Sequence, residues 1–233
     1  MAAHRLYGHH AVLAALENPL RRPKRLWITA ENKALVPKQP PCSVEVVDKQ
    51  ALHKLAPAGA VHQGWVLDCA LLEQPALEDI VAEEPQTIIL LDQVTDPQNI
   101  GGIIRSAAAL GAAAVVVQDR HAPGETPALV KTACGGFERV PYIGVTNLSR
   151  SLTDLQAAGY WCIGFSEHAD VSFAPKLFSQ KTVLVFGAEG EGMRRLVTER
   201  CDQLARLPTN PDFPSLNVTS TVTAVLLSRV LAD

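Results

Sequence analysis

The 233-residue sequence lacks long apolar runs, paired cysteines and an apolar leader. Its longest apolar stretches, such as Thr87–Leu91 and Ala112–Val117, are far shorter than the roughly 20 residues that a membrane-spanning helix needs. The start, Met-Ala-Ala-His-Arg, gives no reason to expect a secretory signal. The five cysteines are odd in number and include no Cys-x-x-Cys pair, which argues against a disulfide framework and a zinc ribbon. We therefore expect a soluble, cytoplasmic protein.

Several signatures of enzyme classes are also missing. No Gly-x-Gly-x-x-Gly follows Leu91 or Phe186, which disfavours a nicotinamide-dependent dehydrogenase. No Gly-x-Ser-x-Gly is present, which disfavours a hydrolase of the nucleophile-elbow type. The seven histidines show no His-Glu-x-x-His spacing and no suitable pairing with cysteine, so we expect no metal site.

The net charge of -3 conceals an uneven distribution along the chain. Residues 1–60 contain nine Lys or Arg and four Asp or Glu, whereas the remainder contains twelve and twenty. The densest basic run is Arg21–Arg25. Such a run is typical either of a solvated turn or of a surface that binds a polyanion such as RNA.

The hydrophobic pattern predicts an α/β protein with two domains and a linker between them. We expect a small α/β domain over residues 1–74, a Glu- and Pro-rich linker over 75–86 and a larger α/β domain over 87–233. In the larger domain, strands that are apolar on both faces alternate with helices, which indicates a mostly parallel sheet covered on both sides. The expected strands are Thr87–Leu91, Ala113–Gln118, Val140–Val145, Tyr160–Ser166, Lys181–Phe186 and Gln203–Leu207.

Three unusual segments follow predicted strands, where open α/β sheets bind their ligands. The first runs from Leu91 to Arg105, with Asp96 and Pro97 placed to begin a helix. By spacing alone, Arg105 would be a solvated helix residue. The second, Gly187–Gly192, is rich in glycine, but its two glutamates would repel a pyrophosphate and suit a neutral or cationic ligand. The third, Leu207–Val218, contains three prolines (Pro208, Pro211, Pro214) and leads into the final helix.

Together these segments resemble the three motifs of the SpoU family of RNA ribose 2′-O-methyltransferases. Asn99–Arg105 resembles the first motif, Gly187–Gly192 the second and Ser215–Val218 the third. The segments Leu6–Leu16 and Gly59–Gly64 are similar to the amino-terminal RNA-binding domain of the branch that methylates guanosine in large-subunit ribosomal RNA, and Cys134–Pro141 and Val145–Leu148 resemble the same branch. The resemblance covers nearly the whole chain.

The resemblance implies a carboxy-terminal domain with a deep trefoil knot, S-adenosylmethionine as cofactor, and a homodimer with its active site at the interface. It implies that RNA is the partner, not DNA, because the acceptor is the ribose 2′-hydroxyl. It favours the RNA interpretation of Arg21–Arg25. It also assigns catalytic positions to Asn99, Arg105, Glu189, Ser215 and Asn217, and cofactor contacts to Gly187, Leu207 and Leu216. Pro211 stands roughly where the family has glycine.

The implied activity is the methylation of a guanosine ribose in large-subunit ribosomal RNA. Two alternatives stay open: a transfer RNA substrate, and a non-catalytic RNA-binding or assembly factor with the same fold. The sequence does not choose the target nucleotide. Nor does it decide whether Arg105 acts as a base or as a phosphate clamp, although a guanidinium is normally too basic to accept a proton.

Overall fold

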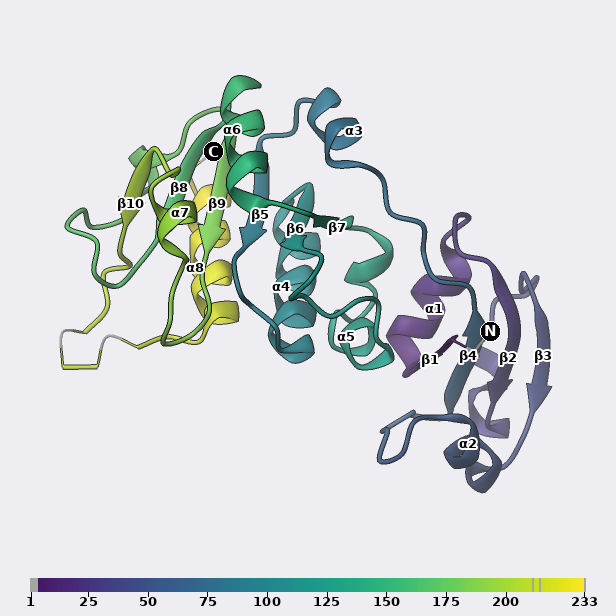
Figure 1. Ribbon diagram of the computed structural model, residues 1–233. Coiled ribbons are helices and arrows are strands. Elements are labelled where there is room, and N and C mark those ends of the chain that lie inside the picture. The colour runs from purple at the N-terminus through teal and green to yellow at the C-terminus, as the bar shows by residue number, and fades with distance from the viewer. Residues whose placement is uncertain (1–3, 211, 214, 233) are drawn as a thin grey trace.

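The computed structural model describes residues 4–210, 212–213 and 215–232. Pro211 and Pro214, two of the three prolines expected to stiffen the third segment, lie outside the described residues. The described residues form two sheets, one of four strands and one of six, with helices around each (Figure 1). Among the described residues, no helix is both long and apolar enough to cross a membrane.

The four-stranded sheet is built by the amino-terminal part of the chain. Its strands are arranged in the order β1-β4-β2-β3. Helix α1 packs Ala11, Val12, Ala15 and Leu16 inwards, the spacing of one helix face. The elements are β1 His4–Tyr7, α1 His9–Glu17, β2 Pro23–Ile28, the 3-10 helix η1 Ala30–Leu35, β3 Ser43–Val46, α2 Lys49–Leu55 and β4 Trp65–Cys69.

The six-stranded sheet is entirely parallel, with the order β10-β8-β9-β5-β6-β7. The predicted parallel sheet is therefore confirmed, and each of its expected strands is present with bounds shifted by at most two residues. The strands are β5 Thr87–Leu91, β6 Ala114–Gln118, β7 Tyr142–Val145, β8 Trp161–Phe165, β9 Thr182–Phe186 and β10 Gln203–Ala205.

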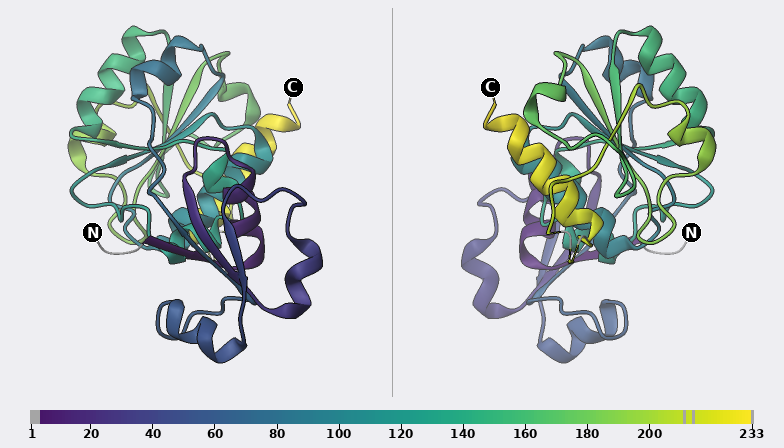
Figure 2. Two further views of the ribbon diagram at one scale, coloured as in Figure 1. Left: turned by 90° about the vertical axis from the view of Figure 1, so that its right-hand side faces the viewer. Right: turned by 90° about the vertical axis from the view of Figure 1, so that its left-hand side faces the viewer.

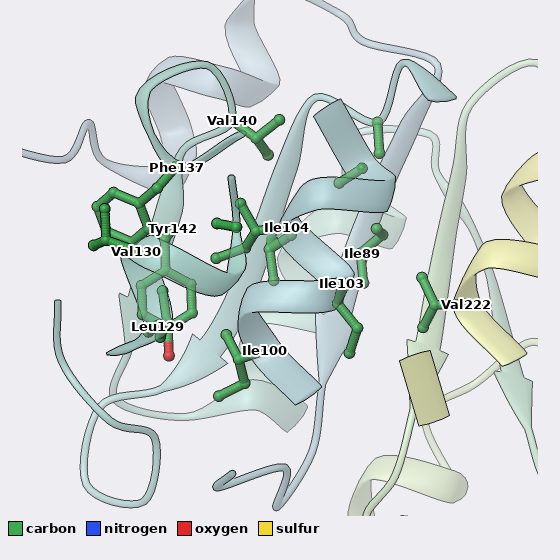
Figure 3. Packing of buried hydrophobic residues seen from close by; sticks show 14 of the residues in the cluster. Ile89, Ile100, Ile103, Ile104, Leu129, Val130, Phe137, Val140, Tyr142 and Val222 are labelled. Carbon is green, nitrogen blue, oxygen red and sulfur yellow. The ribbon is translucent and has the colours of Figure 1, made fainter. Parts of the chain in front are cut away.

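Helices cover both faces of this sheet, which is why its strands are apolar on both sides. Strand β5 shows the alternation: Ile89 and Leu91 belong to one buried cluster, and Ile88 and Leu90 to the other. Helices α4, α5 and α8 lie on the first face, whose packing is shown in Figure 3, and α3, α6 and α7 lie on the second (Figure 2). The remaining elements are α3 Leu77–Ala82, α4 Pro97–Leu110, α5 Pro127–Thr132, η2 Gly136–Glu138, α6 Leu148–Ala157, η3 Pro175–Leu177, α7 Arg195–Thr198 and α8 Val218–Val230.

Helix α3 lies within the segment expected to be a linker. Leu77 and Ile80 are buried against the second face of the six-stranded sheet, so this part of the connection packs as a helix. The expectation rested on the Glu and Pro content around it, which hides two apolar residues spaced by three. The domain boundaries at 74 and 87 remain a prediction.

Candidate active site at the carboxyl ends of the strands

Helix α4 begins directly after β5 and places Asn99 near its amino-terminal end. The Asp96 carboxylate caps the helix by accepting a hydrogen bond from the Gln98 amide at 2.9 Å, and Pro97 occupies the first turn, as the sequence predicts. Ile100, Ile103 and Ile104 anchor the helix in the core (Figure 3). Asn99 stands outside this buried stripe and is half-buried.

The glycine-rich loop after β9 folds back on itself. The Ala188 amide donates to the Gly192 carbonyl at 3.1 Å and the Gly192 amide donates to the Ala188 carbonyl at 2.9 Å. A Cβ atom at Gly187 would lie 2.1 Å from the Gly192 carbonyl carbon and 2.3 Å from the Met193 nitrogen. Only glycine fits at this position, because the clashing atoms are backbone. The turn so formed presents the Glu189 side chain.

The three predicted motifs meet at Asn217, which caps helix α8. Its Oδ1 accepts from the Thr219 amide at 2.8 Å. Its Nδ2 donates to Asn99 Oδ1 at 3.0 Å and to Glu189 Oε1 at 2.7 Å. The Val218 amide also donates to Glu189 Oε1, at 3.2 Å. Three of the five predicted catalytic residues therefore form one hydrogen-bonded cluster.

Thr219 is a member of this site that sequence reasoning missed. Its hydroxyl donates to the Asn99 carbonyl at 3.1 Å. A Cβ atom at Gly102 would lie 2.8 Å from the Thr219 methyl group, so the glycine allows α4 and α8 to approach closely. The presence of Gly102 one turn after Asn99 was a signal of that approach, but the sequence does not name the partner helix.

A cavity of about 720 Å³ opens beside the cluster. The rings of Phe165 and Phe186, stacked with centroids 4.7 Å apart, form part of its wall. Five predicted positions line it: Gly187, Glu189, Leu207, Ser215 and Leu216. All three predicted cofactor-contact residues are thus at one cavity, together with two of the predicted catalytic residues.

The lining suits S-adenosylmethionine in size and chemistry. A volume of this order is typical of small-molecule sites. The apolar wall can receive an adenine ring, while the carboxylates of Glu189 and Glu191 favour a cation over an anion.

A buried ion pair fixes the end of the glycine-rich loop. Asp92, fully buried directly after β5, accepts hydrogen bonds from the Arg194 amide at 2.7 Å and from Nε at 2.8 Å, and its Oδ1 atom forms an ion pair with Nη2 at 2.7 Å. The pair therefore ties the residue that follows the loop to the central strand. Sequence reasoning missed it, because an aspartate after a strand carries no sign of which arginine it binds.

Comparison with known proteins agrees with this geometry. Residues 86–227 match the model of the SpoU rRNA Methylase family, and residues 5–75 match the model of an RNA 2′-O ribose methyltransferase substrate-binding domain. The chain belongs to the SpoU family. Its relatives include the 23S rRNA (guanosine-2′-O-)-methyltransferase RlmB of Escherichia coli, 38% identical over 95% of each chain. The protein of the same name from Pseudomonas syringae is 37% identical over 97% of this chain and 94% of its own.

Solved structures of other methyltransferases share the fold. An rRNA methyltransferase from Sinorhizobium meliloti, solved with S-adenosylmethionine bound, matches with a TM-score of 0.81 at 23% identity and covers 99% of this chain and 87% of its own. AviRb from Streptomyces viridochromogenes, also with the cofactor, matches with a TM-score of 0.80 at 24% identity over 99% and 90% of the two chains. At these identities the likeness concerns the fold.

Arg105, the remaining predicted catalytic residue, stands apart from the cluster. It lies on α4 six residues after Asn99, and its side chain is exposed. The described contacts do not join it to Asn99, Glu189, Ser215 or Asn217. An exposed guanidinium is available to a polyanionic substrate.

The basic residues of the run Arg21–Arg25 differ in burial: one is buried and three are exposed. Arg21 is buried against Glu125 and Glu138, so the interpretation of this residue as an RNA contact is wrong. A charge pattern does not show that two acids more than 100 residues away neutralise one arginine. Lys24 and Arg25 are exposed, as is Arg22, and these three residues stay available to the RNA that SpoU enzymes bind.

Proposed function

We propose that the protein transfers a methyl group from S-adenosylmethionine to the ribose 2′-hydroxyl of a guanosine in large-subunit ribosomal RNA. The observation that carries this proposal is the meeting of all three SpoU motifs in one hydrogen-bonded cluster of Asn99, Glu189 and Asn217, beside a cavity that Glu189 lines. The relatives named above, which are 23S rRNA guanosine methyltransferases, supply the substrate class.

Binding of the cofactor would rest mainly on the backbone and the apolar wall. Gly187, Leu207 and Leu216 line the cavity and would hold the adenosine, and the carboxylates of Glu189 and Glu191 would balance the positive sulfonium. When bound, S-adenosylmethionine supplies an activated methyl group. Because methyl transfer is an in-line displacement, the protein contributes chiefly by positioning and by excluding water.

The hydrogen-bonded cluster would orient the reacting groups. Asn217 Nδ2 holds both Asn99 and Glu189, so the three side chains have fixed directions before substrate arrives. Ser215 stands beside them at the cavity and can donate or accept a hydrogen bond at the ribose. We assign Arg105 to the phosphate next to the target ribose, because a guanidinium donates hydrogen bonds and does not accept the proton.

The proposal includes a homodimer in the cytoplasm. Leu227, Val230 and Leu231, near the end of α8, are large apolar residues left exposed in the single chain. A partner subunit covering this end would remove them from water, and the family resemblance implies an active site at such an interface. The trefoil knot of the family also remains part of the proposal.

Nucleoside mass spectrometry of ribosomal RNA from a deletion strain tests the function. One 2′-O-methylguanosine should disappear from large-subunit RNA and return with the wild-type gene, but not with an Arg105→Ala variant. Retention of every ribose methyl group in that RNA, with loss of one from transfer RNA, would move the substrate to transfer RNA. Loss from neither RNA would favour a non-catalytic binding role.

A further inference from the structure

A buried ion-pair network connects the amino-terminal domain to the catalytic domain. The Arg21 guanidinium is completely buried and contacts the carboxylates of Glu125 and Glu138, whose side chains are only 6% and 2% exposed. Arg21 Nε donates to Glu138 Oε2 at 3.2 Å, and Nη1 donates to the Ala70 carbonyl at 3.0 Å. One cation from the first domain is therefore enclosed by two anions from the second.

The remaining carboxylate contacts also cross between the domains. Asn18 Nδ2 donates to Glu138 Oε2 at 2.7 Å. The Leu72 amide donates to Glu125 Oε2 at 2.8 Å, and His4 Nε2 lies 2.9 Å from Glu125 Oε1. Every group that contacts these two carboxylates precedes residue 75, and both carboxylates follow residue 86. Because a buried charge without its partner is very unfavourable, the network selects one relative orientation of the two domains.

Apolar packing continues across the same boundary. Val12 and Ala15 of α1 belong to the same buried cluster as Leu129 of α5 and Phe137 of η2. The Lys131 ammonium lies 5.3 Å from the centre of the Tyr7 ring, a cation–π contact between α5 and β1. Figure 1 shows α5 between the catalytic sheet and the four-stranded sheet. The domains therefore share a core and are not joined by the connecting segment alone.

The segment that carries Glu138 also packs on the helix that carries Arg105. A Cβ atom at Gly136 would lie 3.1 Å from the Ile104 carbonyl oxygen and 3.2 Å from the Arg105 Cα atom. On the other side, a Cβ atom at Gly135 would lie 3.0 Å from the Ala14 Cβ atom and 3.5 Å from the His10 carbonyl oxygen. The turn at Gly135 and Gly136 is therefore packed closely against α1 on one side and against α4 on the other.

From these contacts we infer that Arg21, Glu125 and Glu138 are positioning residues, which hold the RNA-binding domain in register with Arg105. The inference rests on the proposed function. RNA held by the first domain is presented at one fixed place relative to α4, because the ion pairs set the orientation and the Gly135–Gly136 turn sets the distance. A domain on a loose tether would instead present RNA in many orientations, few of them productive.

Arg21→Ala tests the inference. Arg22→Ala is the matched control for the scattering and proteolysis measurements. Arg22 is the next residue, but its side chain is 75% exposed and pairs only with the exposed Glu73 at 3.3 Å. Small-angle scattering should show a larger radius of gyration for Arg21→Ala than for wild type and Arg22→Ala. A Glu-specific protease should also cleave Arg21→Ala faster within residues 71–86, which hold four glutamates.

The kinetic readout separates positioning from general stability. For Arg21→Ala, we expect kcat/KM for ribosomal RNA to fall by about tenfold or more, with the affinity for S-adenosylmethionine within about twofold of wild type. Arg21→Lys, which restores the charge, should recover part of the rate. Wild-type scattering in Arg21→Ala would overturn the inference, and so would an altered orientation with unchanged kinetics on RNA. A parallel loss of cofactor affinity would assign Arg21 to general stability and also overturn it.

A milder variant covers the case in which Arg21→Ala does not fold. Glu138→Gln keeps an acceptor for Arg21 but loses the negative charge and one acceptor for Asn18. It should change the radius of gyration and kcat/KM for RNA in the same direction as Arg21→Ala does, but to a smaller extent. Glu73→Gln is its exposed control. Failure of the wild-type protein to methylate ribosomal RNA would refute the proposed function, whereas the scattering comparison decides the orientation by itself.

Discussion

Substituting Gly187 by alanine tests the close packing of the glycine-rich loop. The new Cβ atom would lie 2.1 Å from the Gly192 carbonyl carbon, and ordinary contact begins at 3.4 Å, so the two segments must separate by about 1.3 Å. Side-chain rotation cannot relieve the clash, because the neighbours are backbone atoms. The separation would strain or break the pair of hydrogen bonds between Ala188 and Gly192.

Overpacking of this kind typically costs about 1–3 kcal/mol. If the loop relaxes in the free protein and must return to the wild-type conformation to bind S-adenosylmethionine, this cost weakens the affinity for the cofactor by about 5- to 150-fold. Calorimetry measures that affinity, and thermal unfolding shows any part of the cost that falls on stability. Gly190→Ala is the control, since its Cβ atom would meet nothing within 4 Å and only its left-handed backbone, with φ of 82°, would be strained. A Gly187→Ala protein with wild-type affinity and melting temperature would refute the packing argument.

Three further outcomes are expected. Arg105→Ala should lower methyl transfer by about 100-fold while calorimetry shows unchanged cofactor affinity, since the residue lies outside the cavity; equal losses would make its role structural. Asp92→Asn should destabilise the protein by about 1–3 kcal/mol in urea unfolding, because it removes the ion pair with Arg194 and weakens two hydrogen bonds from that residue. Burial alone would raise the pKa of Glu125, but hydrogen bonds from His4 and Leu72 and the charge of Arg21 hold it below its ordinary value. The contribution of the ionised Glu125 to stability should therefore be present at neutral pH and lost as the pH falls through that lowered pKa. In urea unfolding between about pH 3 and pH 7, the free energy of unfolding of Glu125→Gln should fall less steeply towards acid pH than that of wild type.

The fold was predictable from the sequence where buried elements produce a clear hydrophobic pattern. The parallel strands are continuous apolar runs, so their existence, order along the chain and approximate bounds follow from composition. Strand β1 was not predicted, because it is only four residues long and its sequence, His-Arg-Leu-Tyr, shows no hydrophobic periodicity. Its strand character comes from pairing with β4, more than 55 residues away. Helix α3 was not predicted for a similar reason, since two buried residues are too few to establish a helical periodicity.

Side-chain partners across long sequence separations were not predictable. The three motifs could be placed at strand ends, and the family resemblance supplied Asn99, Glu189 and Asn217, but nothing in the sequence states that Asn217 Nδ2 bonds the other two. The same limit explains the error on Arg21, whose acidic partners lie 104 and 117 residues further along the chain. Charge runs report local composition, while burial of a charge depends on which element packs over it.

The choice of asparagine at position 217 shows how a local rule and a tertiary requirement combine. Capping of α8 needs a side-chain acceptor for the Thr219 amide, which Ser, Thr, Asp or Asn can supply. The cluster needs in addition a donor to Asn99 and Glu189, which excludes aspartate: its second oxygen would face the Glu189 carboxylate at the 2.7 Å where Nδ2 now stands. Serine and threonine have one hydroxyl hydrogen and cannot serve both neighbours while capping the helix. Only asparagine, with an acceptor at one end and two donor hydrogens at the other, meets both demands, and so the residue that begins a helix also joins the three motifs.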